Sequence, residues 1–195
     1  REAKYRRILD AAVEVIAEKG FANSRVSEIA ARAGVADGTI YLYFKGKDQI
    51  LMAALDDAFA SFLENARAEV AHMTDVREKL VAVIRLHLQA MEQNRSLAVV
   101  LQTELRQSAK FLAEFSQRQL HCYLKLLRDI IKEAQGEGTF RDSVPERLAV
   151  SCLFGALDDV VTAWVLSDRE YELAPMADGI YDLFLHGMIS ERARR

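Results

Sequence analysis

The chain has 195 residues, of which 51% are hydrophobic and 28% are charged, and this composition excludes a chain that is mostly disordered. Its net charge of −3 is unevenly divided, because residues 1–47 hold nine Lys and Arg against six Asp and Glu, which leaves −6 for the rest. A basic N-terminal segment on an acidic body is typical of a chain that binds phosphate at one end.

Several classes of protein find no support in the sequence. The two cysteines, Cys122 and Cys152, lack metal-ligand spacing, so we expect reduced thiols and no metal site. The four histidines are scattered and no nucleophile or phosphate-loop motif is present, so we predict no enzyme activity, no catalytic residue and no cofactor. Because we find no signal peptide and no apolar run long enough to cross a bilayer, we expect a cytoplasmic protein without a membrane partner.

Apolar residues recur at spacings of three and four along the whole chain, and only two prolines, Pro145 and Pro175, interrupt it. Such spacing predicts an all-α fold. Glycines, prolines and capping residues divide the chain into about nine helices. In chain order the expected helices are 3–19, 26–33, 37–44, 48–71, 76–93, 97–103, 108–135, 145–167 and 175–189.

The first three expected helices have the layout of a helix-turn-helix, in which a scaffold helix precedes two short helices joined by a turn. Gly34 fits that turn, because glycine adopts a positive φ without strain. The third helix combines hydroxyl donors, aromatic side chains and lysines, which solubility alone explains poorly. The residues expected to form a small core beneath it are Phe21, Val26, Ile29, Ala30, Ala33, Val35 and Ile40.

Five segments resemble the TetR family of one-component repressors, namely Ile8–Ala12, Gly20-Phe21, Val26–Ala30, Ala33–Val35 and Gly38–Phe44. The resemblance implies an N-terminal three-helix helix-turn-helix domain at 1–47 and a C-terminal helical domain for effector binding and dimerisation at 48–195. It also implies that the third helix enters the major groove of double-stranded operator DNA. The residues expected at the DNA are Ser27, Asp37, Gly38, Thr39, Tyr41, Tyr43 and Lys47.

Within this set the resemblance places Thr39 and Tyr41 near bases or backbone, and Tyr43 and Lys47 at phosphates. Hydroxyl and ammonium groups are suitable donors to phosphate oxygens, and Ser27 offers a further hydroxyl at the start of the second helix. Asp37 repels phosphate, so it either accepts a hydrogen bond from a cytosine amine or stays away from the DNA.

The helices expected between 76 and 167 carry more large apolar residues than one bundle core needs. Such residues form either core or the lining of a pocket, and the family resemblance implies an effector cavity between these helices. The residues expected to line it are Phe62, Leu86, Met91, Leu101, Leu105, Arg106, Phe111, Phe115, Tyr123, Leu127, Phe154 and Trp164.

The segments Leu101–Ser108, Asp37–Phe44 and Phe154–Asp159 look like those of the acyl-CoA-responsive fatty-acid-degradation repressors within the family. This resemblance implies a hydrophobic effector, long-chain acyl-CoA, with cations near the CoA phosphates. The candidate cations are Arg106 first, then Lys110 and Arg118. Alternatively, Arg106 forms a salt bridge with Glu104 or Asp158 and stabilises a helix end.

Small and polar residues form one stripe along the helix expected at 145–167, and such a stripe lets a partner helix approach closely. Together with apolar residues of the last helix, it resembles the four-helix dimer interface of the family. A two-fold homodimer would place two recognition helices about 34–36 Å apart, one turn of DNA. The residues expected at this interface are Ser151, Gly155, Asp159, Thr162, Ile180, Leu183, Phe184 and Met188.

These observations predict a homodimeric repressor that binds palindromic operator DNA, is released by long-chain acyl-CoA and controls fatty-acid degradation. One alternative is a repressor of the same family that responds to another hydrophobic molecule, in drug or efflux regulation. The other is an α-helical lipid-binding protein without DNA function. An electrophoretic mobility shift assay with a palindromic operator distinguishes the lipid-binding protein from the two repressors, because a protein without DNA function does not shift the operator.

Overall fold

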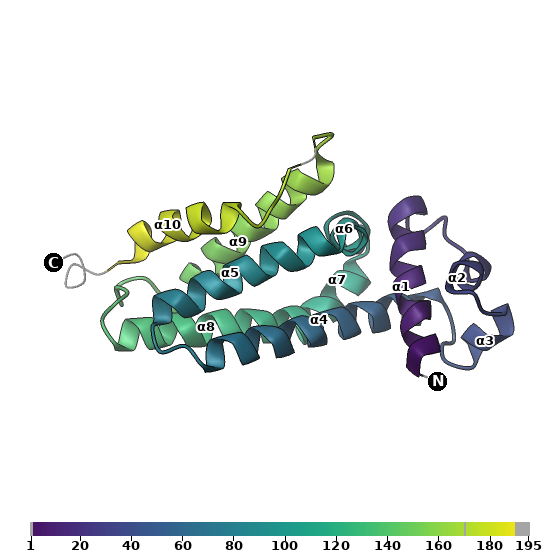
Figure 1. Cartoon of the computed structure of the whole chain (residues 1–195), viewed down its shortest axis with the longest axis horizontal. Helices are drawn as coiled ribbons and strands as arrows, with labels where there is room; N and C mark the ends of the chain where they lie inside the picture. Colours follow the sequence, from purple (N-terminus) through teal and green to yellow (C-terminus); the bar gives the residue numbers. More distant parts are fainter. Residues whose placement is uncertain (1, 170, 190–195) are drawn as a thin grey trace. The chain divides into compact units, whose positions relative to one another are not determined.

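The computed structural model describes residues 2–169 and 171–189, and within these ranges the chain is helical and forms no β-strand (Figure 1). The predicted all-α fold is confirmed. The α-helices are α1 (Glu2–Lys19), α2 (Val26–Ala33), α3 (Asp37–Tyr41), α4 (Lys47–Ala71), α5 (Val76–Gln93), α6 (Arg95–Val99), α7 (Ala109–Phe115), α8 (His121–Gly136), α9 (Glu146–Leu166) and α10 (Met176–Met188). Three shorter helical elements lie between them, namely the π-helices η1 (Val100–Glu104) and η3 (Ser116–Leu120) and the 3-10 helix η2 (Leu105–Gln107).

The chain folds into two compact units. The first unit comprises Arg1–Ser61 and Asn94–Gln119, and the second comprises Phe62–Gln93 and Leu120–Arg195. The first unit therefore combines the expected DNA-reading helices with a segment from the middle of the chain. That middle segment holds α6, α7, η1, η2 and η3 as far as Gln119.

In the first unit, α1 buries one face against α2. Ile8 and Ile16 of α1 are fully buried, as is Ile29 of α2, because apolar residues recur at helical spacing on the facing sides of both helices. Gly34 follows α2 with φ 64°, in the left-handed region, and its N–H and that of Val35 bond to carbonyls of the last turn. The turn predicted at Gly34 is confirmed.

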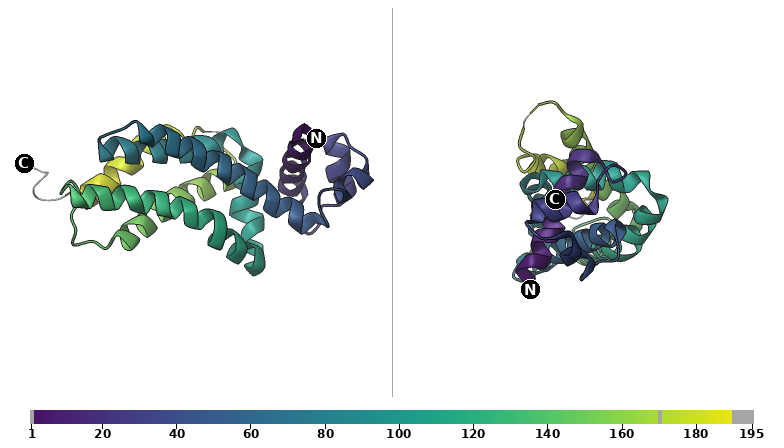
Figure 2. Two further views of the ribbon diagram at one scale, coloured as in Figure 1. Left: turned by 90° about the horizontal axis from the view of Figure 1, so that it is seen from below. Right: turned by 90° about the vertical axis from the view of Figure 1, so that its right-hand side faces the viewer.

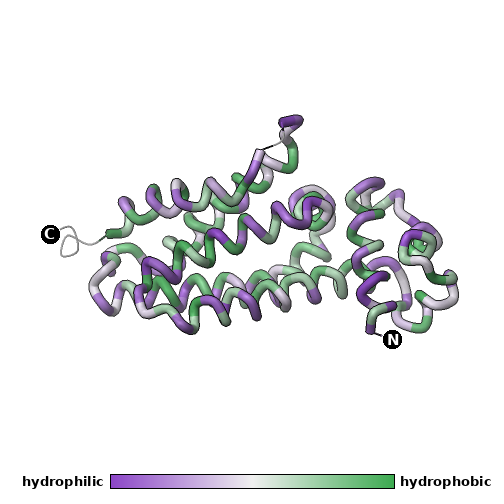
Figure 3. Tube along the Cα trace, in the orientation of Figure 1, coloured by the Kyte–Doolittle hydropathy of each residue, from purple (hydrophilic) through white to green (hydrophobic). Residues whose placement is uncertain are grey.

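In the second unit, α5, α8, α9 and α10 pack against one another (Figure 1, Figure 2). Figure 3 shows hydrophobic and hydrophilic residues alternating along α5 and α10, as expected for helices with one buried face. Fully buried side chains at the centre of this unit include Leu88 of α5, Tyr123 and Leu127 of α8, and Leu157 of α9.

The apolar helix α9 has the length and composition of a membrane-crossing helix. It packs against α5, α8 and α10, and Leu153 and Leu157 lie in the core of the second unit. Outside this core α9 also carries exposed apolar residues, among them Leu148 and Leu166.

The third helix is shorter than expected, because it ends at Tyr41 and not at Phe44. The Ile40 carbonyl accepts hydrogen bonds from the N–H groups of both Tyr43 (2.9 Å) and Phe44 (3.0 Å), which closes the helix into a tight turn. Phe44 is thereby brought inside, where only 5% of it is exposed.

The helices expected at 97–103 and 108–135 are correctly located but less regular than expected. The first begins earlier, at Arg95, because the Asn94 side chain accepts a hydrogen bond from the Leu97 N–H and caps it. It then passes through η1 and η2. The second begins after Ser108, which caps α7, and is interrupted by η3 before α8. A π-turn contains one residue more than an α-turn and leaves no periodic signal in the sequence.

Candidate nucleic-acid interface and effector site

The short helix α3 turns one side inward and the other to solvent. Ile40 is fully buried, and Phe44 stacks on Tyr5 of α1 with ring centroids 5.3 Å apart. On the opposite side, 59% of Tyr41 and 78% of Leu42 are exposed. An exposed aromatic residue at the end of a five-residue helix, followed directly by an exposed leucine, is suited to contact another surface.

The residues predicted to bind DNA lie on α2, on α3, in the turn that follows α3 and at the start of α4. Ser27, Asp37 and Gly38 are exposed, whereas Thr39 and Tyr43 are half-buried. The Tyr43 ring meets the edge of Tyr5, with ring centroids 5.9 Å apart, so the core of the first unit orients it. Sequence reasoning missed Leu42, although its position between two candidate tyrosines was a usable signal.

Lys47, the last of the predicted DNA-binding residues, contacts the loop between α1 and α2. Its ammonium group donates to the Phe21 carbonyl and, at 2.7 Å, to the Ser24 carbonyl, and lies 4.3 Å from the centroid of the Phe21 ring. Burial lowers the pKa of Lys47 below its usual value, while nearby Asp48 and Glu28 oppose this shift. An ammonium group has three N–H donors, so one remains for a phosphate oxygen.

The same loop is held from the middle segment of the first unit. A carboxylate oxygen of Glu104, in η1, accepts the Phe21 N–H at 2.7 Å. Gly20 precedes it with φ 78°, and a Cβ there would lie 3.3 Å from the Glu104 carboxylate, so glycine suits both the backbone conformation and the close approach. Phe111 meets the Phe21 ring edge-on at a centroid distance of 5.0 Å. No sequence signal identifies the contact between Glu104 and Phe21, because these two residues are 83 positions apart.

In the first unit, four of the residues predicted to line an effector site, Leu101, Leu105, Phe111 and Phe115, are buried. Phe115 packs edge-on against Phe59 of α4, with centroids 4.8 Å apart. Leu101 lies in η1, Leu105 in η2, and Phe111 and Phe115 in α7, so Glu104 lies between candidate effector contacts along the chain.

The three candidate cations also lie in the first unit, and all three have acidic or polar neighbours. Arg106 is exposed and donates a hydrogen bond to the Gln102 side chain at 2.6 Å. Lys110 and Arg118 form ion pairs with acidic residues of α4, at 3.7 and 2.8 Å. Because these side chains are largely exposed, such pairs are weak enough for a phosphate to replace the carboxylate.

In the second unit, the other predicted lining residues lie on four helices. Met91, Tyr123, Leu127 and Trp164 are buried, and Phe62, Leu86 and Phe154 are half-buried. The indole N–H of Trp164 donates to the Tyr171 carbonyl at 2.8 Å, so this side chain also fixes the segment that follows α9.

Four aromatic rings of the second unit form one cluster around Tyr123. His87 stacks on Tyr123 with an interplanar angle of 24° and a centroid distance of 5.5 Å. Phe62 and Phe154 meet Tyr123 edge-on, at 5.3 and 6.1 Å. Burial lowers the pKa of His87 to about 4, although Asp158 opposes the shift, so the imidazole is neutral at pH 7. Sequence reasoning missed His87, which has no neighbouring ligand or motif in the sequence.

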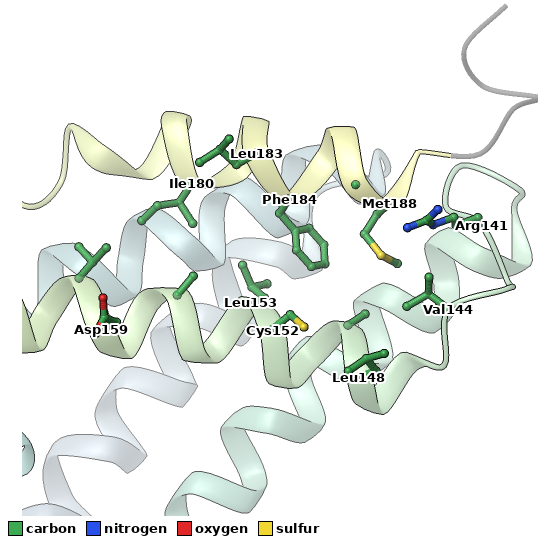
Figure 4. A pocket seen from close by; sticks show the side chains of 14 residues that line it. Arg141, Val144, Leu148, Cys152, Leu153, Asp159, Ile180, Leu183, Phe184 and Met188 are labelled. Atoms are coloured by element: carbon green, nitrogen blue, oxygen red, sulfur yellow. The ribbon is translucent and has the colours of Figure 1, made fainter.

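A groove of about 600 Å³ runs between α9 and α10 and contains most of the predicted dimer residues (Figure 4). Ile180 and Phe184 extend from α10 toward α9, where Leu153 and Cys152 face them. At its rim, 79% of Leu183 is exposed, whereas Met188 is buried within the chain. Asp159 lines the groove from α9, where it is exposed. The remaining predicted residues are Ser151 and Gly155, which are exposed on α9, and Thr162, which is half-buried and donates to the Asp158 carbonyl at 2.8 Å.

A helix-turn-helix with an outward-facing third helix, followed by an apolar helical body, defines a DNA-binding regulator of transcription. Comparison with known families supports this class along most of the chain. Residues 8–54 match the family described as bacterial regulatory proteins, tetR family, and residues 55–187 match the YsiA-like protein, C-terminal region. The chain belongs to the TetR family.

Individual relatives extend the comparison. The chain is 39% identical to the fatty acid metabolism regulator protein of Bacillus subtilis, over 96% of this chain and 97% of that one. A structure of the fatty acid degradation regulator FadR from Bacillus halodurans matches with a TM-score of 0.90 and 41% identity, covering 94% of this chain and 95% of that one. FadR from Bacillus subtilis in complex with stearoyl-CoA matches with a TM-score of 0.89 and 40% identity, covering 94% and 98%. The predicted resemblance to fatty-acid-degradation regulators is confirmed.

Proposed function

We propose that this protein is a cytoplasmic, homodimeric repressor of fatty-acid degradation genes, without enzyme activity, which long-chain acyl-CoA releases from operator DNA. The observation that carries the proposal is the 40% identity, over 94% of the chain, to a regulator crystallised with stearoyl-CoA. The outward-facing third helix supports the DNA-binding half of the proposal, because both Tyr41 and Leu42 are exposed there.

For DNA binding, residues 1–47 form the reading domain and residues 48–195 form the effector and dimer domain. Exposed Gly38 and Tyr41 reach base edges or backbone, since only accessible groups at the recognition helix enter a groove, whereas Asp37 either accepts a hydrogen bond from a cytosine amine or stays away from the DNA. The remaining contacts are made to sugar and phosphate by Ser27, Thr39, Tyr43 and the third N–H of Lys47. Lys47 thus serves twice, because it orders the loop before α2 and also approaches the DNA.

Leu42 is expected to read a thymine, because the thymine methyl group is the apolar feature of the major groove and 78% of Leu42 is exposed. Replacing the contacted thymine by deoxyuridine removes only this methyl, and should weaken operator binding by about fivefold or more. In the Leu42→Ala variant the same replacement should change nothing. Fluorescence anisotropy with operators carrying single uracils measures both values. If every thymine replacement weakened operator binding equally in the unmodified protein and in Leu42→Ala, the contact between Leu42 and a thymine methyl would be contradicted.

For effector binding, the acyl chain contacts apolar residues among those predicted from the sequence, which are buried or half-buried within their own units. Burial of a long alkyl chain supplies affinity at about 0.8 kcal/mol per methylene, so affinity should rise with chain length. Arg106 is exposed and has the planar donor geometry that suits a phosphate, so it holds the CoA end with Lys110 and Arg118.

For dimerisation, α9 and α10 of one protomer pack against the same helices of its partner. The groove between them and the exposed Leu183 form an apolar surface, and Gly155 presents a flat strip of backbone on α9. Covering this surface by a second copy of the chain explains why α9 is apolar on more than one side.

The effector signal reaches the DNA-reading helices through the loop between α1 and α2. Glu104 accepts a hydrogen bond from the Phe21 N–H, and Lys47 donates one to the Phe21 carbonyl. This loop therefore joins η1, which holds candidate effector contacts, to the start of α4. A ligand that moves η1 displaces Glu104 and with it Phe21. The acyl-CoA complex is then the state with lower operator affinity, as linkage requires of a ligand that favours one of two states.

The proposal is tested by calorimetry and by operator binding. Titration with CoA esters of 8, 12, 16 and 18 carbons should show affinity that rises steeply with chain length, by up to about fourfold per methylene. Without acyl-CoA, the protein should shift a palindromic operator in a mobility shift assay and should not shift a scrambled sequence of equal length. Binding of esters without any operator shift would favour a lipid-binding protein instead, and operator binding without affinity for any ester would favour a repressor of another hydrophobic molecule.

A further inference from the structure

The aromatic cluster of the second unit contains a polar group with no function in the fold. The Tyr123 hydroxyl is buried and finds no hydrogen-bond partner among the residues that the structure describes. The whole side chain is 0% exposed, so bulk water does not reach it. Buried hydroxyl groups are nearly always hydrogen-bonded, and a phenol that only packed would be replaced by phenylalanine without loss.

The ring that carries this hydroxyl contacts three other aromatic rings. Phe62 and Phe154 meet the ring of Tyr123 edge-on, while His87 stacks on its face. Burial raises the pKa of Tyr123 above its usual value, so the phenol stays protonated and remains a donor. A neutral imidazole beside it offers one donor and one acceptor nitrogen.

We propose that the Tyr123 hydroxyl, next to His87, binds an oxygen atom attached to the carbon chain of the effector. This inference rests on the proposed acyl-CoA function and specifies one contact in it. The oxygen is either the thioester carbonyl, which all acyl-CoA esters share, or a hydroxyl group on the chain itself. In both cases the ligand supplies the partner that the free protein lacks, so the contact favours oxygenated chains over plain hydrocarbon.

The experiment compares Tyr123→Phe with the unmodified protein in calorimetric titrations with three CoA derivatives. These are hexadecanoyl-CoA, the thioether S-hexadecyl-CoA, which lacks the carbonyl oxygen, and 3-hydroxyhexadecanoyl-CoA. If the thioester carbonyl is the partner, the unmodified protein should bind hexadecanoyl-CoA about tenfold more tightly than the thioether. If a chain hydroxyl is the partner, the 3-hydroxy ester should instead bind about tenfold more tightly than the plain ester. In Tyr123→Phe the corresponding preference should disappear.

A second readout separates this role from simple packing. Because Tyr123→Phe removes an unpaired hydroxyl from the interior, the free variant should melt about 2–4 °C higher than the unmodified protein while binding its effector less tightly. Tyr171→Phe is the matched control, since it removes an equally sized hydroxyl from a side chain that is 39% exposed. It should change neither melting nor binding.

The outcomes distinguish this inference from the proposed function. Equal affinities of Tyr123→Phe and the unmodified protein for all three derivatives would overturn the inference and leave the acyl-CoA proposal intact. Lower melting of Tyr123→Phe would also overturn it, because the hydroxyl would then have a partner in the free protein. If the unmodified protein binds none of the three derivatives, the proposed function itself fails.

Discussion

The Glu104→Ala variant should still bind both operator and acyl-CoA, yet acyl-CoA should release it from DNA far less effectively. Glu104 accepts the Phe21 N–H at 2.7 Å and is the one charged contact described between η1 and the loop before α2. A hydrogen bond to a charged group contributes about 1.5–3 kcal/mol, which is comparable with a typical coupling energy of about 1–3 kcal/mol. Its loss should reduce the effect of acyl-CoA on operator affinity by about tenfold or more.

Operator affinity measured with and without saturating hexadecanoyl-CoA gives this ratio directly, and calorimetry verifies that the variant still binds the ester. Glu114→Gln is the matched control, because Glu114 lies in the same segment but pairs with Arg118 and not with the loop. The control should be released like the unmodified protein. An undiminished ratio in Glu104→Ala would show that the signal reaches the DNA-reading helices by another route.

Replacing Gly155 by leucine should make the folded chain more stable and should abolish operator binding. Gly155 lies within α9, and a Cβ there would meet nothing within 4 Å inside the chain. A helical glycine is about 1 kcal/mol less favourable than a good helix former, so each protomer gains stability. In the proposed dimer, however, the new side chain holds the two copies of α9 apart. Because a palindrome is read by two recognition helices, operator affinity should fall by about a hundredfold or more.

Sedimentation, thermal melting and operator titration together measure the three effects of Gly155→Leu. The matched control is Gly136→Leu at the end of α8, where a Cβ also meets nothing within 4 Å. That variant should remain dimeric and bind operator normally. Leu183→Glu provides a second variant, since it would bury a carboxylate in the interface. A dimeric Gly155→Leu protein with normal operator affinity would exclude α9 from the interface.

Regular helices could be predicted closely, because their signals are local. The helices 26–33 and 76–93 were expected with the bounds that the structure gives them. Gly34 marked the turn between α2 and α3, since only a residue tolerant of positive φ suits that position. The π-helices η1 and η3 could not be predicted, because an extra residue in one turn shifts the helical register without changing the composition.

The candidate site was predictable only where its residues are close in the sequence. The candidate DNA contacts at and after α3 could be inferred because Thr39, Tyr41 and Tyr43 lie within five residues. The contact between Glu104 and Phe21, and the stack of His87 on Tyr123, join residues far apart in the chain. Such pairs have no periodicity or motif, so their discovery required the fold. The domain boundary after residue 47 and the residues assigned to DNA, effector and dimer remain predictions.

The central claim is that acyl-CoA and operator bind the same protein and that each weakens the binding of the other. It is tested by measuring operator affinity with and without hexadecanoyl-CoA, and hexadecanoyl-CoA affinity with and without operator. Linkage requires that hexadecanoyl-CoA weaken operator binding by the same factor by which operator weakens hexadecanoyl-CoA binding. We expect equal factors of about 5–150. An operator affinity that is unchanged at saturating hexadecanoyl-CoA would contradict the account.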